Sequence, residues 1–167
     1  MLTGEVAAVR GPDEAYTRLF GAEFAYVRRT IHVIVGDAAA AEDITQDAFV
    51  QLLLHWRKVS HYERPDAWVR RVAIRMAVRH LKREGRRQLV EATADPPAGF
   101  PHVDPDLDAA IRELPPKQRA VLVLFYFEDR PMKEIAQLMG MSESTGFVHL
   151  HRARAKLASL LGEEVEA

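Results

Sequence analysis

Apolar side chains recur every three or four positions along the first half of this chain, which is the spacing of one face of an α-helix. A first helix is predicted from Pro12 to a closing glycine, Gly36. Asp37 is suited to cap a second helix over residues 38–58, and a third helix is predicted over 66–83. The apolar stripes of these three helices are formed by Tyr16, Phe20, Phe24, Val27, Ile31 and Ile34; by Ile44, Ala48, Leu52 and Trp56; and by Trp68, Val69, Val72, Ala73, Met76 and Leu81.

Residues 88–105 interrupt this periodicity with four prolines, a glycine and several acidic residues, which predicts a flexible linker. We therefore expect an all-α fold of two small helical domains, at 12–87 and 106–161. The second domain should begin with a short helix capped by Asp106. A strongly apolar helix over 117–127 should form its core.

The C-terminal pattern, over residues 131–157, is that of two helices that meet at a tight turn. The first helix is predicted over 132–139, with the small Ala136 where the two helices approach each other. Gly140 supplies the positive φ that a sharp reversal requires, and Ser142 is a natural N-cap for the second helix. This combination is typical of a helix-turn-helix, whose second helix enters the DNA major groove. An ordinary hairpin of two packed helices is the alternative interpretation.

The overall composition adds little to these predictions, but the distribution of charge along the chain is informative. The 167 residues are 48% hydrophobic, and no apolar run approaches the roughly 20 residues of a membrane-spanning helix. Absence of cysteine excludes disulfides and thiolate metal sites and fits a cytoplasmic location. The net charge is only −1, but residues 64–87 carry nine basic and two acidic side chains, a local net charge of +7. Such a local field attracts phosphate whatever the total charge is.

The third predicted helix carries most of this basic block on one face. Like charges four residues apart destabilise an isolated helix by a few tenths of a kcal/mol per pair, and a phosphate backbone would relieve them. A merely solvated face and an acidic protein partner are the alternatives. The loop before this helix adds two rings and a cation that suit stacking on a base beside a phosphate. The helix residues are Arg71, Arg75, Arg79, Lys82 and Arg86, and the loop residues are His61, Tyr62 and Arg64.

The second predicted helix has a polar stripe beside more hydrophobic residues than one core requires. The stripe consists of Asp43, Gln46, Asp47 and Val50, and the surplus hydrophobic residues are Phe49, Leu53 and Leu54. A solvated face is one interpretation. A surface that docks a partner protein is the other, because exposed apolar side chains beside polar ones are typical of interfaces.

Five segments occur in a recognisable order: AEDITQDAF (41–49), RPDAWVRRVA (64–73), LPPKQRAVLVLFYFE (114–128), EIAQLMGMSEST (134–145) and LHRARAKL (150–157). Together they resemble the extracytoplasmic-function (group IV) sigma factors of bacterial RNA polymerase, which belong to the sigma-70 family. The resemblance covers nearly the whole chain. It implies a region 2 domain at 12–87 and a region 4 helix-turn-helix domain at 106–161.

The resemblance also implies roles for matching residues. Docking on the clamp helices of the largest polymerase subunit falls to Asp43, Gln46, Asp47 and Phe49. Recognition of the −10 element and melting of the duplex fall to His61, Tyr62, Arg64, Arg71, Arg75, Arg79 and Lys82. Reading of the −35 element falls to Lys133, Ser144, Thr145, Phe147, Val148, His151 and Arg152. The implied partners are core RNA polymerase, including its β flap, and promoter DNA, with an anti-sigma factor as a regulator in many relatives.

This chain departs from the family pattern in both DNA-reading helices. Gly146, Phe147 and Val148 stand where the family usually has a β-branched core residue, a basic residue and a small polar residue. The glycine is expected to leave a core position unfilled, while Phe147 and Val148 cannot donate hydrogen bonds but could contact a thymine methyl group. In the third helix Ile74, Arg75 and Arg79 stand where Arg, Asn and Asp are common. We therefore expect a nonstandard promoter.

Other functions receive less support from the sequence. The seven histidines are scattered, and there is no HExxH motif, no phosphate-binding glycine loop and no carboxylate pair in an evident cleft. We therefore expect no enzymatic activity, no metal and no cofactor. A sigma-like DNA-binding regulator that does not recruit polymerase is the main alternative, and the acidic docking stripe argues against it.

Overall fold

The structure is a computed structural model, and it describes residues 12–90 and 104–162. Within those two ranges it contains eight helices and no β-strand. The helices are α1 (Glu14–Val35), α2 (Ala38–Leu54), α3 (Trp56–Val59), α4 (Pro65–Val90), α5 (Pro105–Arg112), α6 (Pro116–Tyr126), α7 (Met132–Met139) and α8 (Glu143–Leu160). The predicted all-α fold of two helical domains is confirmed.

The predicted helix boundaries at the turns follow from local chemistry. Gly36 ends α1 with a left-handed φ of 71°, and the Asp37 carboxylate then accepts from the amides of Ala39 and Ala40 at the start of α2. Gly140 ends α7 with φ 66°, and the Ser142 hydroxyl accepts from the Thr145 amide at the start of α8. The two helices of the predicted helix-turn-helix are therefore confirmed.

Several predicted boundaries are wrong. The first helix begins at Glu14 and not at Pro12, because the Asp13 carboxylate caps it and accepts from the Tyr16 amide. The second helix ends at Leu54, because His55 leaves the helical conformation, and α3 follows as a separate turn. The third helix continues beyond residue 83 to Val90, since Gly85 is tolerated and no proline follows it there. Asp104, not Asp106, caps α5, because Pro105 presets the first helical residue. The rest of the predicted linker lies outside the described residues.

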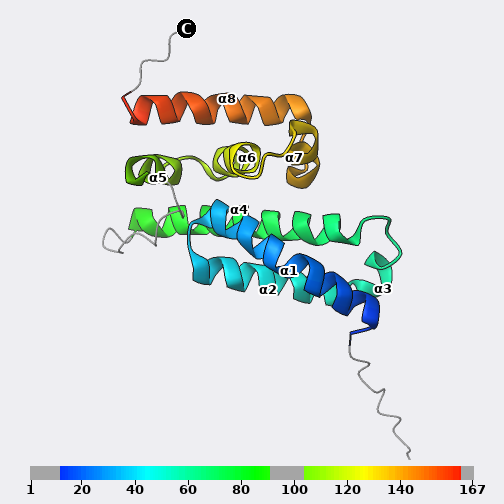
Figure 1. The fold of residues 1–167 in the computed structure, drawn as a ribbon. Helices are drawn as coiled ribbons and strands as arrows, with labels where there is room; N and C mark the ends of the chain where they lie inside the picture. The colour runs from blue at the N-terminus through cyan, green and yellow to red at the C-terminus, as the bar shows by residue number, and fades with distance from the viewer. Residues whose placement is uncertain (1–11, 91–103, 163–167) are drawn as a thin grey trace, which may run out of the picture.

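The helices form layers that place the two domains one on the other (Figure 1). We call α1–α4 the N-terminal bundle and α5–α8 the C-terminal bundle. In the first, α1 packs on α2 and both pack on α4; in the second, α8 packs on α5, α6 and α7. The C-terminal bundle rests on the N-terminal one through α6 and α7, so that α8 forms the layer farthest from α1 and α2 (Figure 1).

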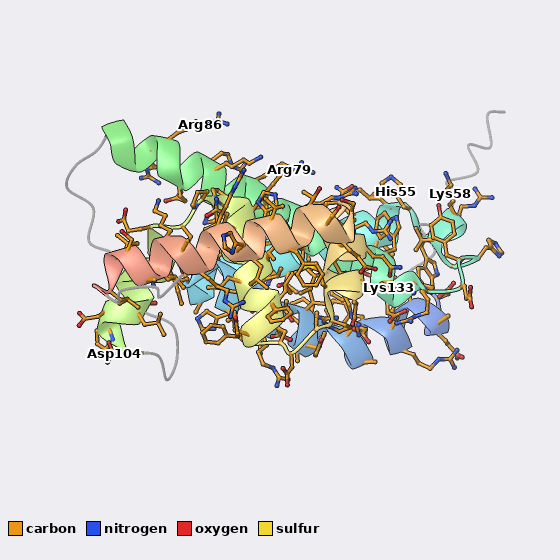
Figure 2. The ribbon with its side chains drawn as sticks, turned by 90° about the horizontal axis from the view of Figure 1, so that it is seen from above. His55, Lys58, Arg79, Arg86, Asp104 and Lys133 are labelled. Carbon is orange, nitrogen blue, oxygen red and sulfur yellow. The ribbon has the colours of Figure 1, made fainter. Side chains whose placement is uncertain are left out.

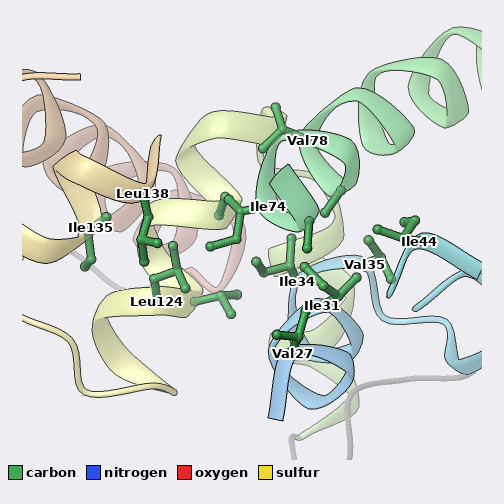
Figure 3. Packing of buried hydrophobic residues seen from close by; sticks show 14 of the residues in the cluster. Val27, Ile31, Ile34, Val35, Ile44, Ile74, Val78, Leu124, Ile135 and Leu138 are labelled. Atoms are coloured by element: carbon green, nitrogen blue, oxygen red, sulfur yellow. The ribbon is translucent and has the colours of Figure 1, made fainter. Parts of the chain in front are cut away.

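The contact between the two bundles is apolar at its centre. Ile74 of α4 is 2% exposed and lies between Ile34 of α1 and the pair Leu124 and Leu138 from α6 and α7 (Figure 3). These residues belong to one continuous cluster of buried side chains that joins both bundles. The sequence predicted two domains, and the shared core is an additional finding of the structure.

Arginines from the C-terminal bundle flank this centre. The Arg130 guanidinium donates to the Tyr26 hydroxyl of α1 and also to Glu134. Arg112 donates through Nη2 to the carbonyl oxygen of Gly36 at 3.2 Å. A cation at the carbonyl end of a helix is favourable, because that end carries a partial negative charge.

The expectation of an unfilled core position at Gly146 is wrong. Gly146 is buried, and a Cβ atom on it would lie only 2.4 Å from the sulfur of Met132, the first residue of α7. Met132 is 4% exposed and occupies the space that a β-branched side chain on α8 would take. A large side chain on α7 thus packs against a glycine on α8.

Gly146→Val is therefore expected to destabilise the protein by about 1–3 kcal/mol, the usual cost of overpacking a filled core. Met132→Ala alone should cost about 2–5 kcal/mol through the cavity that it leaves. The double variant should lose clearly less than the sum, because the valine then fills the space vacated by the methionine. Urea unfolding followed by circular dichroism measures all three values. Simple additivity would contradict direct packing of Met132 on Gly146.

Candidate DNA-binding and docking surfaces

The basic face of α4 consists of five exposed side chains, Arg71, Arg75, Arg79, Lys82 and Arg86. Arg79 and Arg86 lie along the same edge of the molecule (Figure 2). Within the described ranges none of the five is paired with a carboxylate. Since nothing there offsets their mutual repulsion, this face is electrostatically complementary to a phosphate backbone.

Arg70, which flanks this face in the sequence, is instead partly buried between α4 and α1. Its guanidinium lies 2.7 Å from the Glu23 carboxylate and 4.7 Å from the centre of the Tyr26 ring. The ion pair and the ring contact join α4 to α1. Arg70 therefore has a structural role in this arrangement.

Part of the basic face borders the C-terminal bundle. Arg75 and Arg79 line a groove of about 170 Å³ together with Lys117 of α6 and Met139 of α7. A Cβ atom on Gly140, the turn of the helix-turn-helix, would lie 3.2 Å from Nη2 of Arg75. The face predicted to hold the −10 region thus lies directly beside the module predicted to read the −35 element.

The loop between α3 and α4 exposes His61, Tyr62 and Arg64, as the sequence suggested. Its turn is held by backbone bonds from His61 to Lys58 and from Tyr62 to Val59. Arg64 donates to both carboxylate oxygens of Asp66, at 3.0 and 2.8 Å, and this hydrogen bonding lowers the pKa of Asp66. The contact with Asp66 fixes the orientation of the Arg64 guanidinium at the start of α4.

The predicted docking surface on α2 is acidic at one end and apolar at the other. Asp43, Gln46 and Asp47 are exposed. Toward the C-terminal end of α2, the exposed hydrophobic side chains are Val50, Leu53 and Leu54, at 52%, 43% and 71% exposure. We call these six residues the α2 docking surface. Such a mixture of charge and uncovered apolar area is typical of a protein interface.

Phe49, which the resemblance assigned to docking, is not exposed on this surface, and its docking role stays a prediction. It is 1% exposed, and its ring packs on those of Phe20 and Phe24, at centroid distances of 5.0 and 5.4 Å. Its backbone carbonyl accepts from the Tyr16 hydroxyl. The spacing in the sequence was a signal for this burial, because Phe49 lies three residues before the predicted core residue Leu52 and so shares its helix face. In the structure both residues are buried.

The exposed face of α8 contains most of the residues predicted to read the −35 element. Ser144, Thr145, His151 and Arg152 are exposed, as is Lys133 at the start of α7 (Figure 2). Phe147 and Val148, which lie on the same face between Thr145 and His151, are 51% and 46% exposed. Gly146, Leu150 and Ala153 form the buried side of the same helix. The exposed face of α8 is therefore a mixture of polar and apolar side chains, and the opposite face packs on the rest of the C-terminal bundle.

His149, where the family often has arginine, lies at the edge of this face and is half-buried. Its Nδ1 atom is buried without a hydrogen-bond partner among the described residues. Burial, together with the nearby cations Lys117 and Arg152, lowers its pKa from the usual 6.5. The neutral form is therefore favoured in the folded protein.

This shift makes stability sensitive to acid. The unfolded chain binds a proton at His149 more readily than the folded protein does. The contribution of neutral His149 to the free energy of unfolding is therefore present above about pH 6.5, and it is lost as the pH falls through the folded-state pKa. His149→Gln is expected to reduce the fall in melting temperature between about pH 7.5 and pH 5.5. Thermal unfolding at both values, for variant and parent, measures the effect. Equal falls would contradict the assignment.

The described part of the chain contains no candidate metal site and no candidate membrane-spanning helix. In that part no three histidines or carboxylates are grouped so as to hold a metal ion. None of its helices is long and apolar enough to span a bilayer.

A helix-turn-helix with an exposed second helix, beside an arginine face without carboxylate partners in the described ranges, is typical of a DNA-binding protein. Residues 19–87 match the family model Sigma-70 region 2, and residues 105–157 match Sigma-70, region 4. The chain is 34% identical over 145 residues to the RNA polymerase sigma-E factor of Streptomyces avermitilis, which covers 83% of this chain and 78% of that relative. The chain belongs to the sigma-70 family and is an extracytoplasmic-function sigma factor, which directs promoter-specific transcription by RNA polymerase.

Further similarities extend over almost the whole chain. The RNA polymerase sigma factor CarQ of Myxococcus xanthus is 29% identical over 161 residues, which covers 92% of each chain. The fold is similar to that of the sigma factor RpoE solved in complex with the anti-sigma factor NepR from Bartonella quintana. That match has a TM-score of 0.67 at 16% identity and covers 92% of this chain and 100% of that chain.

Proposed function

We propose that three surfaces of this sigma factor divide the work of initiation. The α2 docking surface binds the clamp helices of the largest polymerase subunit. The loop with His61, Tyr62 and Arg64 captures a base of the −10 element, while the basic face of α4 holds the opening duplex. The exposed face of α8 reads the −35 element. The protein acts in the cytoplasm and catalyses no reaction itself.

The observation that carries this proposal is the unpaired basic face of α4. Its five cations have no carboxylate partner in the described ranges, so no ion pair there offsets their repulsion. Phosphate groups would offset their repulsion and release bound counterions. A regulator that does not recruit polymerase would use this face too, but it has no use for the exposed acidic and apolar residues of α2.

Run-off transcription over a promoter library, with bacterial core polymerase and the full chain, tests the proposal. We expect initiation from a defined subset of promoters that share −10 and −35 sequences. Binding of promoter DNA without initiation, together with no affinity for core polymerase, would favour the stand-alone regulator. Core polymerase without this protein is the control for background initiation.

The arrangement of the bundles has to change before both promoter elements are read. Elements centred near −10 and −35 are separated by about 25 base pairs, or about 85 Å of B-form DNA at 3.4 Å per base pair. Here the helix-turn-helix packs directly on α4. We infer that the two bundles separate when polymerase and promoter bind. An anti-sigma factor, the partner in the RpoE structure, is a further candidate ligand of this chain.

Arg112→Ala combined with Arg130→Ala is expected to favour the separated form. Arg130 donates to the Tyr26 hydroxyl of α1, and Arg112 donates to the carbonyl oxygen of Gly36, which follows α1. Removal of both guanidinium groups therefore weakens the contact between the bundles. Small-angle X-ray scattering should report a larger radius of gyration, and association with core polymerase should become faster. Arg154→Ala, on the far helix α8, is the matched control. An unchanged radius of gyration would contradict the inference.

A further inference from the structure

Two exposed hydrophobic side chains stand next to each other in the first turns of α8. Phe147 and Val148 are 51% and 46% exposed and follow Gly146, which is buried against Met132. In the described structure α8 packs on α5, α6 and α7, and it forms the outer layer of the molecule (Figure 1). The N-terminal bundle therefore does not cover this pair. Its uncovered apolar area is unusual in a helix whose neighbouring positions are polar.

Polar and basic residues surround the pair in a defined order. Ser144 lies one turn before it, and His151 and Arg152 lie one turn after it, on the same exposed face. In a helix that enters the major groove, the N-terminal residues contact base edges. Arg152 is then placed to contact a phosphate. The apolar pair is thus located where base edges are expected.

The major groove offers one apolar group to such a pair. Guanine, cytosine and adenine present hydrogen-bond donors and acceptors, whereas thymine also presents its C5 methyl group. Neither Phe147 nor Val148 can hydrogen-bond through its side chain. Placing them against a G·C pair would bury polar edge atoms without partners, which costs free energy. An A·T pair also has polar edge atoms, but its thymine methyl turned toward α8 offers an apolar contact that offsets part of this cost.

We propose that Phe147 and Val148 are specificity-determining residues that read thymine methyl groups at neighbouring positions of the −35 element. This inference rests on the proposed role of α8 in promoter recognition. It assigns apolar contact as the basis of recognition at these positions, where the family pattern has a basic and a small polar residue. Thymine is preferred on the strand that faces the pair, and sequence is read there without a hydrogen bond.

The test removes single methyl groups from DNA. Deoxyuridine replaces each −35 thymine in turn, on a promoter selected by run-off transcription, and binding by core polymerase with the full chain is measured by fluorescence anisotropy. Deoxyuridine pairs as thymine does but lacks the C5 methyl group. We expect about a fourfold loss of affinity at one or two positions, the ratio expected when one buried methyl group is removed. 5-Methylcytosine at a cytosine that replaces such a thymine should recover part of the loss.

Variants of the protein assign the effect to the two side chains. Phe147→Ala and Val148→Ala should each bind the thymine promoter more weakly and lose sensitivity to deoxyuridine at one position. Both residues are exposed, so the fold should tolerate alanine. Leu160→Ala, at a residue 47% exposed near the end of the same helix, should keep full sensitivity.

The outcomes separate this inference from the proposed function. Promoter-specific initiation that is indifferent to deoxyuridine would overturn the inference and leave the sigma factor role intact. Loss of affinity for core polymerase, rather than for DNA, in Phe147→Ala would also overturn it, since the pair would then contact the polymerase. A failure of all promoter-specific initiation by the parent protein would instead count against the proposed function.

Discussion

Asp43→Lys combined with Asp47→Lys is expected to lower the affinity for core RNA polymerase by at least about tenfold while leaving the fold intact. The two carboxylates are exposed one helical turn apart and make no ion pair in the described structure. Removing them therefore costs α2 little stability. At a polar interface, a change of four charge units replaces attraction by repulsion and slows association as well.

Titration of labelled core polymerase with the variant measures this loss, and circular dichroism confirms the fold. Asp106→Lys with Glu113→Lys is the matched control, because it changes the charge equally at two exposed acidic residues near α5. Affinity equal to that of the parent would exclude the acidic end of the α2 docking surface from the interface. Equal losses in both double variants would point to net charge and not to the surface.

The apolar end of the same surface provides an independent check of its extent. Leu54 is 71% exposed and contributes nothing visible to the core. If α2 docks along its whole exposed face, Leu54→Ala should weaken polymerase binding without affecting unfolding.

Arg75→Ala combined with Arg79→Ala is expected to weaken promoter binding and to flatten its dependence on salt. Each phosphate contact contributes about 0.9 to the slope of log affinity against log salt, so two lost contacts should reduce the slope by nearly 2. Both side chains are exposed on α4 and unpaired in the described structure, so the fold should be retained.

Promoter binding by the assembled holoenzyme, measured across a series of salt concentrations, gives the slope. Arg18→Ala with Arg29→Ala removes two exposed arginines of α1 and serves as the control with the same charge change. A slope identical to that of the parent would remove this part of α4 from the DNA interface. A reduced slope in both double variants would indicate long-range attraction and not contact.

Local sequence signals predicted the helices because each signal acts over only a few residues. Gly36 and Gly140 adopt the left-handed conformation that these positions require, and Asp37 and Ser142 cap the helices that follow. These interactions need no distant partner. For the same reason the helix-turn-helix and its exposed face were predictable without a structure.

Burial was less predictable where a helix has more than one neighbour. Phe49 was assigned to a docking surface because it widens the apolar face of α2, yet α1 covers it with Phe20 and Phe24. Gly146 was expected to leave a gap, yet Met132 from α7 fills it. In each case a side chain from another helix decides the outcome, and helical periodicity cannot identify that side chain.

The sequence by itself determined the helical elements, their caps, the order of the five family segments and the basic block that they carry, since all of these are properties of neighbouring residues. Only the tertiary structure decided how the two bundles meet. Ile74 stands where arginine is common in the family, and it is buried where α4 meets α6 and α7. Arg70 pairs with Glu23, whereas Arg75 and Arg79 stay exposed beside the helix-turn-helix. The physical reason is that burial and ion pairing depend on residues far away in the chain, whose positions follow from packing of the whole fold.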